Sequence, residues 1–574
     1  MCGIFMYKGY GFHDIDPDRL KLLIGHRGPD GFGYWTSQES RLLFAHSRLA
    51  IQDLTSSALQ PMHSDNHRYT VIFNGEIYNF RELRATYLSD QDFSTASDTE
   101  VLLKLWALMG HHCLKHLEGM FAFVIYDSLK RNVHVVRDRF GIKPLYIYSN
   151  YGKIIICSEI KPILDHIDVQ EDEQTISDFL EAGLLDHSER TFFKDISHFE
   201  PASHLILDQH GNTIHHEKYY SIPRYIDSLD NLTLQDKLEH LAFVLELVVR
   251  QSLVSDCKIA VNLSNGSDSA LLACIIDKLG FNARSYTQFY GASVDGETIH
   301  QSNMKIYRER QYIPIHVDEV RDSLVQTHWH QEEPYSGLFI DGYSILYRQA
   351  NNSGYKVFLD GNGLDEFFLG YDKYRSTRYP SILGPQSIDS TFQPFNILDK
   401  SFLASTKRYT YKPVTNAREH SLDDLQKYKI PRGLRFNDKV SMQHGCELRV
   451  PFLDHRLLDV AYSFSNEQLQ NNQLGKLPLR SILSDHLGRD FAFQPKNHKQ
   501  SLQTEWLKSS LIDLLLDVSH NGSVIADGII CKDKFALLVD RLRSGELYNS
   551  FQAWQVLSLE IWRSLFITKT LKYS

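Results

Sequence analysis

A polar stretch between Ser221 and Leu232 divides the chain into two parts with different residue patterns. The stretch has no clear hydrophobic period, which is typical of a segment between domains. The chain has 574 residues, whereas a single core stops growing at about 250–300 residues. We therefore predict two domains, 1–220 and 233–574.

The part before this boundary is rich in predicted strands. Its short β-branched and aromatic runs, bounded by turn residues, favour strands. They are Tyr69–Phe73, Phe121–Asp127, Asn132–Arg137 and Ile154–Ser158. Glu100–Met109 has helical periodicity.

Strand-like and helix-like runs alternate after the boundary. The predicted strands are Lys258–Leu263, Arg284–Phe289, Tyr312–His316 and Lys356–Leu359. The predicted helices are Leu234–Leu253, Ala270–Leu279 and His300–Arg308, and the pattern is mainly helical from Gly433 onward. Such alternation predicts an α/β domain with a mostly parallel sheet.

Composition excludes several classes of function. The net charge of -10 argues against a non-specific nucleic-acid binder. Seven scattered cysteines form no CxxC pair or Cys/His cluster at zinc spacing, so a disulfide framework or metal knot is not predicted. No charged leader and no long apolar span is present, so we expect no membrane partner and a reducing cytoplasm.

Cys2 is the first candidate catalytic residue. Removal of Met1, favoured by the small residue that follows, would leave Cys2 with a thiol and a free α-amine. Because the pKa of an α-amine is about 7.7–8.0, the amine can act as base for its own thiol. Taken alone, this cysteine is more simply explained as a small residue after the start codon.

Other segments supply groups that could act together with this thiol. Asn74 and Gly75 follow an apolar run and offer an amide and a backbone N–H for an oxyanion hole. Arg48, placed before a strand-like run, is a cation for a carboxylate, and Asp98 is an anion for a substrate ammonium.

Several ordered motifs resemble class II glutamine amidotransferases. They are the Cys2-Gly3-Ile4 start, Arg27–Asp30, Asn74–Asn79, Gly119–Phe123, Arg137–Tyr146 and Ser158–Lys161. The resemblance implies an N-terminal-nucleophile fold of αββα layers, with Cys2 as nucleophile and Asn74 and Gly75 as oxyanion hole. It also implies that Arg48, Glu76 and Asp98 hold the glutamine α-carboxylate and α-amine.

Two strand–loop–helix segments of the second part are candidates for nucleotide binding. Ser264–Ser269 lies between an apolar strand and an apolar helix, where backbone N–H groups gather around an anion. Asp360–Glu366 follows another predicted strand and brings further carboxylates. Ligands of open α/β sheets bind at this end of the strands.

With Asp438–Asp454, these segments resemble the synthetase domain of asparagine synthetases, an ATP-pyrophosphatase fold of the adenine nucleotide alpha hydrolase type. The resemblance implies that a carboxylate, aspartate in that family, reacts with ATP to give an acyl-adenylate. Ammonia from glutamine then arrives through an internal tunnel. A homodimer is the expected assembly. The implied ATP-binding residues are Leu263, Ser264, Gly266, Asp268, Ser269 and Gly361, the implied Mg²⁺ ligands are Asp268 and Asp365, and the implied charge-stabilising lysine is Lys496.

This chain departs from the synthetase pattern at several positions. Asn265 replaces a glycine of the first loop, and Asp360 replaces a serine of the second. Asn362 replaces an acidic residue thought to assist ammonia attack, and an amide cannot accept that proton. Residues 494–500 also differ from the family segment around Lys496.

Three hypotheses therefore stay open. The first is an asparagine synthetase acting on free aspartate. The second is an amidotransferase for another carboxylate, such as a uronic-acid sugar, a peptide or a natural-product intermediate. The third is a glutaminase or regulatory protein with an impaired synthetase site.

Overall fold

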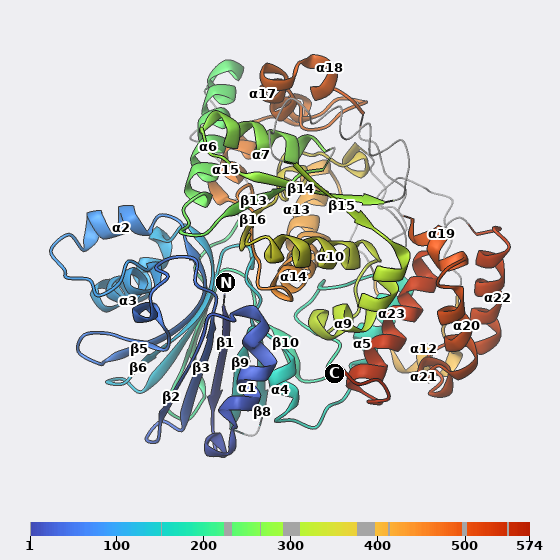
Figure 1. Cartoon of the computed structure of the whole chain (residues 1–574), viewed down its shortest axis with the longest axis horizontal. Helices are drawn as coiled ribbons and strands as arrows, with labels where there is room; N and C mark the ends of the chain where they lie inside the picture. The colour runs from blue at the N-terminus through green and yellow to red at the C-terminus, as the bar shows by residue number, and fades with distance from the viewer. Residues whose placement is uncertain are drawn as a thin grey trace.

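The computed structural model describes residues 2–150, 152–222, 232–264, 266–290, 310–375, 396–410, 414–495, 502–547 and 550–573. Two domains are arranged around the start of the chain, and the strands of the first lie below the parallel sheet of the second (Figure 1). The predicted helix His300–Arg308 and the predicted boundary segment 223–231 lie outside the described residues.

The first domain contains two six-stranded antiparallel sheets. The first sheet has the order β10-β8-β9-β1-β3-β2 and the second β12-β11-β7-β6-β5-β4. The strands of the first sheet are β1 (Gly3–Lys8), β2 (Gly31–Ser37), β3 (Leu42–Arg48), β8 (Tyr146–Asn150), β9 (Lys153–Cys157) and β10 (Ile196–His198). Those of the second are β4 (Met62–His63), β5 (Tyr69–Ile77), β6 (Gly119–Asp127), β7 (Asn132–Arg137), β11 (Ser203–Leu207) and β12 (Thr213–Lys218).

Apolar side chains on both faces of these strands produce a four-layer domain. Ile4 and Met6 of β1 pack with Ile72 and Val124 of the other sheet, while Phe5 and Tyr7 face away into a separate core. Helices α1 (Pro17–Ile24) and α4 (Lys161–Leu164) lie over the first sheet, and α2 (Phe80–Tyr87) and α3 (Asp98–Met109) over the second (Figure 1). The predicted αββα arrangement is confirmed.

The second domain is built on a parallel five-stranded sheet of order β15-β14-β13-β16-β17. Its strands are β13 (Ile259–Asn262), β14 (Arg284–Tyr290), β15 (Arg310–Ile315), β16 (Val357–Leu359) and β17 (Glu447–Arg449). Because β14 lies on one side of β13 and β16 on the other, the chain reverses direction across the sheet between β13 and β16. The crevice outside their carboxyl ends is the usual ligand site of open α/β sheets.

Helices surround this sheet and continue to the C-terminus. They are α5 (Glu173–Ala182, from the first domain), α6 (Leu234–Ser252), α7 (Ser267–Lys278), α9 (Val317–Gln331), α10 (Phe339–Asn352), α11 (Leu364–Phe367), α12 (Lys400–Ser405), α13 (Ala417–Asp423), α14 (Ile430–Met442), α15 (His455–Ser463), α16 (Asn466–Leu469), α17 (Leu477–Leu487), α18 (Arg489–Ala492), α19 (Gln503–Lys508), α20 (Ile512–Asn521), α21 (Ser523–Ala526), α22 (Lys532–Arg543) and α23 (Phe551–Phe566). Among the described residues, none of these helices is long and apolar enough to cross a bilayer.

Most predicted elements are present, with three local corrections. The strand predicted to end before Asn74 continues through the motif to Ile77. Arg48 was expected before a strand but is the last residue of β3. In addition, β17 lies in a region predicted to be mainly helical.

Candidate functional site

Cys2 lies in a small pocket where the two domains meet. Cys2 directly precedes β1. Its backbone nitrogen donates to Oδ1 of Asn74 at 3.0 Å. Arg27 donates from Nε to the Cys2 carbonyl at 3.0 Å. The pocket is lined by Cys2, Arg48, Leu49, Ile51, Gln52, Ala58, Gln60, Phe73, Gly75, Glu76, Ser97, Asp98, Thr99 and Glu447.

Burial raises the pKa of the Cys2 thiol, and hydrogen bonding from the Leu49 backbone and the Arg48 charge oppose the shift. The thiol is therefore mostly protonated at neutral pH. A base must remove its proton before attack. In a chain that begins at Cys2, the α-amine would lie where the nitrogen now contacts Asn74.

Gly75 places backbone against this pocket because no side chain fits there. A Cβ atom at Gly75 would lie 2.2 Å from the Met120 carbonyl oxygen on β6. Asn74 is fully buried behind Cys2, and its Nδ2 lies 3.4 Å from the Ser158 hydroxyl. The structure thus brings both predicted oxyanion residues to Cys2, with Asn74 holding the Cys2 nitrogen as well.

The predicted glutamine-binding residues Arg48, Glu76 and Asp98 line the same pocket. The Arg48 guanidinium donates to the carbonyls of Asp53 and Thr55, which hold it in place. Asp98 accepts from the Ile77 backbone N–H at 2.9 Å, and burial raises its pKa to about 6.

Two residues of the second domain, one lining this pocket and one contacting Glu76 in it, were missed in the sequence. Glu447 of β17 lines the pocket, and Arg449 lies 3.2 Å from Oε2 of Glu76 (Nη2 to Oε2). Burial and the Asp98 charge raise the pKa of Glu76, while Arg449 opposes the shift. Burial opposes ionisation of Glu447, but nearby positive charges, including Arg449, lower its pKa to about 2. Their alternate spacing within the Asp438–Asp454 motif, typical of a strand, was the available signal.

Hydrogen bonds to the hydroxyls of its own serines stabilise the first predicted nucleotide loop. The Ser269 hydroxyl accepts from the Ser264 N–H at 3.1 Å, and the Ser264 hydroxyl accepts from the Gly266 N–H at 3.1 Å. The loop leads into α7, whose N-terminus faces the crevice between β13 and β16. Leu263, buried directly after β13, supports the loop. A helix N-terminus here favours a phosphate.

The second predicted loop lies directly against the first. A Cβ at Gly361 would lie 3.0 Å from the Asp268 carbonyl carbon, so glycine permits this close approach. Lys476, which was missed in the sequence, joins the two loops. Its Nζ lies 2.6 Å from Oδ1 of Asp268 and 2.7 Å from Oδ1 of Asp365. The two predicted metal ligands thus converge on one positive charge, an arrangement that suits a cation.

Asp360 and Asn362, the two departures in the second loop, contact each other. The Asp360 carboxylate accepts from the Asn362 N–H at 3.2 Å and from Asn262 Nδ2 at 3.1 Å. Burial raises its pKa, with a contribution from Asp268. The loop therefore keeps a carboxylate, although not at position 362. Asn265 and Lys496 lie outside the described residues.

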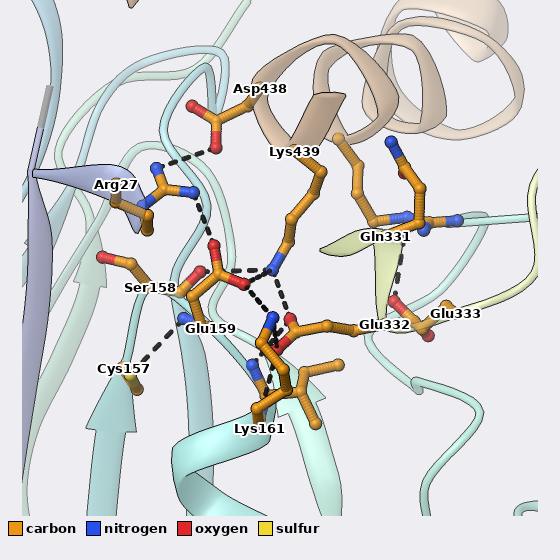
Figure 2. Close-up of polar contacts among 12 residues, drawn as sticks. Arg27, Cys157, Ser158, Glu159, Lys161, Gln331, Glu332, Glu333, Asp438 and Lys439 are labelled. Carbon is orange, nitrogen blue, oxygen red and sulfur yellow. Dashed lines mark hydrogen bonds and ion pairs between the residues drawn. The ribbon is translucent and has the colours of Figure 1, made fainter. Parts of the chain in front are cut away.

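A network of buried charges joins the two domains (Figure 2). Arg27 pairs with Glu159 at 2.7 Å and with Asp438 of α14 at 2.8 Å. Lys439 contacts both Glu159 and Glu332, and its Nζ lies 3.0 Å from Oε2 of Glu159. Because Asp438, Lys439 and Glu332 belong to the second domain, the Cys2 backbone is connected to α14 through Arg27.

This fold and the Cys2 pocket define a glutamine amidotransferase of class II. Residues 1–220 match the family model described as a glutamine amidotransferase domain, and residues 240–564 match the model described as asparagine synthase. The chain belongs to the asparagine synthase family.

Curated relatives resemble the chain over most of its length. Asparagine synthetase [glutamine-hydrolyzing] 3 of Bacillus subtilis is 26% identical over 90% of this chain and 92% of its own. Asparagine synthetase B [glutamine-hydrolyzing] of Escherichia coli is 27% identical over 86% of this chain and 81% of its own. Amidase chry2 of Gibberella zeae is 28% identical over 66% of this chain and 60% of its own.

Proposed function

We propose that this protein is a glutamine-hydrolysing ligase that uses ATP to convert aspartate to asparagine, with release of AMP, pyrophosphate and glutamate. The observation that carries the proposal is the Cys2 pocket, which includes Glu447 from the strand beside the nucleotide crevice. A glutaminase site is thus built together with the domain that would use its ammonia.

Glutamine hydrolysis begins at Cys2. Its α-amine, free once Met1 is removed, takes the thiol proton, and the thiolate attacks the side-chain amide carbonyl of glutamine. The Gly75 N–H and the Asn74 amide stabilise the oxyanion. Arg48 binds the α-carboxylate, and Asp98 and Glu76 face the α-amine. The α-ammonium of Cys2 gives the proton to the leaving nitrogen, ammonia departs, and water hydrolyses the thioester to glutamate and the free thiol.

The carboxylate is activated at the crevice between β13 and β16. The N-terminus of α7 and the Ser264–Ser269 loop hold the ATP phosphates. Asp268 and Asp365 would hold Mg²⁺, which would neutralise phosphate charge. Attack of the aspartate carboxylate on the α-phosphate gives an acyl-adenylate and pyrophosphate, and Lys496 stabilises the charge. Ammonia then replaces AMP.

Ammonia passes from one site to the other inside the protein. The Asp360 backbone N–H donates to the Arg449 carbonyl at 2.9 Å, and Arg449 contacts Glu76 in the glutamine pocket. One short strand, β17, therefore connects the two candidate sites. The homodimer and the cytoplasmic location stay predictions from the sequence.

The test is pyrophosphate release from Mg·ATP and glutamine with aspartate, with the amide product identified by mass spectrometry. Asparagine in the product supports the proposal. Folded protein that hydrolyses glutamine but makes no asparagine contradicts it.

A second candidate, amidation of another carboxylate, is favoured by Asn362 and by the Asp360 contact with Asn262. A panel of uronic acids, peptides and amino acids, run beside aspartate, separates the two. Pyrophosphate release with a different acid alone identifies a specialised enzyme. Release with no acid, while glutamine is hydrolysed, favours an impaired synthetase site.

A further inference from the structure

Histidines gather at the outer edge of the second sheet, away from both candidate sites. His204 of β11 pairs in register with Glu217 of β12, and His215 lies two residues before Glu217. Side chains two residues apart share a face of a strand, so these three side chains share one face. Their nearest ligand atoms all lie within 4.8 Å of one another.

His204 is fully buried, yet its Nδ1 has no hydrogen-bond partner among the described residues. This nitrogen faces Oε1 of Glu217 at 3.7 Å, which is longer than a hydrogen bond. Nε2 of His215 lies 3.3 Å from the same oxygen. A buried polar atom without a partner is costly, so its direction toward a carboxylate requires an explanation.

The second ring nitrogen of His204, Nε2, is held by His134. Its Nε2 lies 3.0 Å from Nδ1 of His134, and the two rings stack at an interplanar angle of 11°. When Nε2 carries the ring proton and donates it to His134, Nδ1 is left with a lone pair that points toward Glu217. Metal-binding histidines usually donate their second ring N–H in this way.

No cation in the described part of the chain neutralises this carboxylate unless a histidine is protonated. Two other clusters of histidine and carboxylate side chains differ in this respect; they are Asp186, His198 and Glu333, and Glu118, Asp454 and His455. Arg435 pairs with Asp186 and Arg456 pairs with Asp454, so both of these clusters hold a permanent cation.

The spacing of the ligand atoms suits a tetrahedral ion. With bonds of about 2.0–2.2 Å, ligand atoms of a zinc site lie about 3.3–3.6 Å apart, close to the 3.3 Å and 3.7 Å seen here. The side chains of His215 and Glu217 are 44% and 41% exposed, so an ion can enter from solvent.

We propose that His204, His215 and Glu217 form a binding site for a divalent transition metal of the Zn²⁺ type, with water as fourth ligand. The site ties the edge strand β12 to β11. Sequence spacing predicted no such cluster, because residues 204 and 215–217 become neighbours only when the hairpin pairs. The proposal is independent of the ligase activity.

The test is calorimetric titration of the chelator-stripped full-length protein with Zn²⁺ at pH 7.5. Wild type is compared with the double variant His215→Ala/Glu217→Gln and with His216→Ala. His216 is the matched control, because it lies on the opposite face of β12 and stacks on Phe199.

We expect wild type and His216→Ala to bind one equivalent that the double variant binds more than about 100-fold more weakly. Zn²⁺ should raise the Tm of the first two proteins only. Identical titrations of all three proteins would overturn the site. X-ray absorption of the zinc-loaded wild type should show nitrogen and oxygen ligands, and a sulfur ligand would place the ion on a cysteine and contradict the proposal.

Discussion

At the scale of single residues, Cys2 has a role that no other described residue of its pocket can supply. We expect Cys2→Ala to lower glutamine-dependent product formation about 10⁴-fold or more, because the covalent step is lost. Amidation with ammonium salts should be unchanged. Both rates are measured in one product assay, and retained glutamine hydrolysis in the variant would exclude Cys2 as nucleophile. Cys113→Ala, which changes a buried thiol elsewhere in the same domain, is the control.

The pKa of Asp98 predicts how glutamine binding depends on pH. Burial raises this pKa from its usual value to about 6, so the carboxylate becomes protonated as the pH falls through 6. A protonated Asp98 no longer attracts the substrate ammonium. The KM for glutamine should therefore rise as the pH falls from 7.5 to 5. Asp98→Asn should have a high KM with little dependence on pH over this range, and an unchanged pH profile in this variant would refute the assignment.

At the scale of elements, Lys476 holds the two loops of the nucleotide crevice together. Lys476→Met would leave Asp268 and Asp365 facing each other without their cation. Removal of one partner of a buried ion pair costs about 3–5 kcal/mol. We expect that loss in the free energy of unfolding, measured with denaturant, together with loss of pyrophosphate release.

The control for this variant is Lys278→Met, on the same helix as Asp268. Lys278 is 53% exposed and pairs with Glu246 at the surface. Exposed pairs contribute about 0–1 kcal/mol, so stability and pyrophosphate release should be nearly unchanged. Equal losses in the two variants would mean that Lys476 does not connect the loops.

The same elements show what can be predicted from the sequence. Strands with continuous apolar runs, such as β9 and β13, were predicted to within one residue at each end because both of their faces are buried. β17 was missed because its three residues include Glu447 and Arg449, which are charged and paired with each other. Charged residues in a buried strand are stable only when they are paired, and the pairing partner is visible only in the folded chain.

The residues of the candidate sites also fall into two groups, those predicted from the sequence and those that were missed. Cys2, Gly75 and Asp98 were predicted because each lies in a local motif of the first domain. Lys476 and Arg449 were not, since their roles depend on contacts with residues more than a hundred positions away. His204 was missed for a related reason, because its neighbours lie on the next strand.

At the scale of the whole molecule, the buried charges of Figure 2 connect the glutaminase domain to the synthetase domain. Lys439→Met removes one of the two lysines that pair with both Glu159 and Glu332, the other being Lys161, and leaves both carboxylates less compensated. We expect a loss of about 3–5 kcal/mol in the free energy of unfolding. We also expect ammonia to escape at the loosened interface, so that more glutamine is hydrolysed per amide formed.

The measurement is the ratio of glutamate to amide product, with ammonium-dependent amidation as the internal reference. Wild type should give a ratio near one, and Lys439→Met a clearly higher ratio at similar ammonium-dependent activity. Arg19→Met is the matched control, because its pair with Asp165, at 2.7 Å, is exposed and lies within the first domain. A ratio that stays near one in Lys439→Met, despite reduced stability, would show that these charges stabilise the protein without coupling the two reactions.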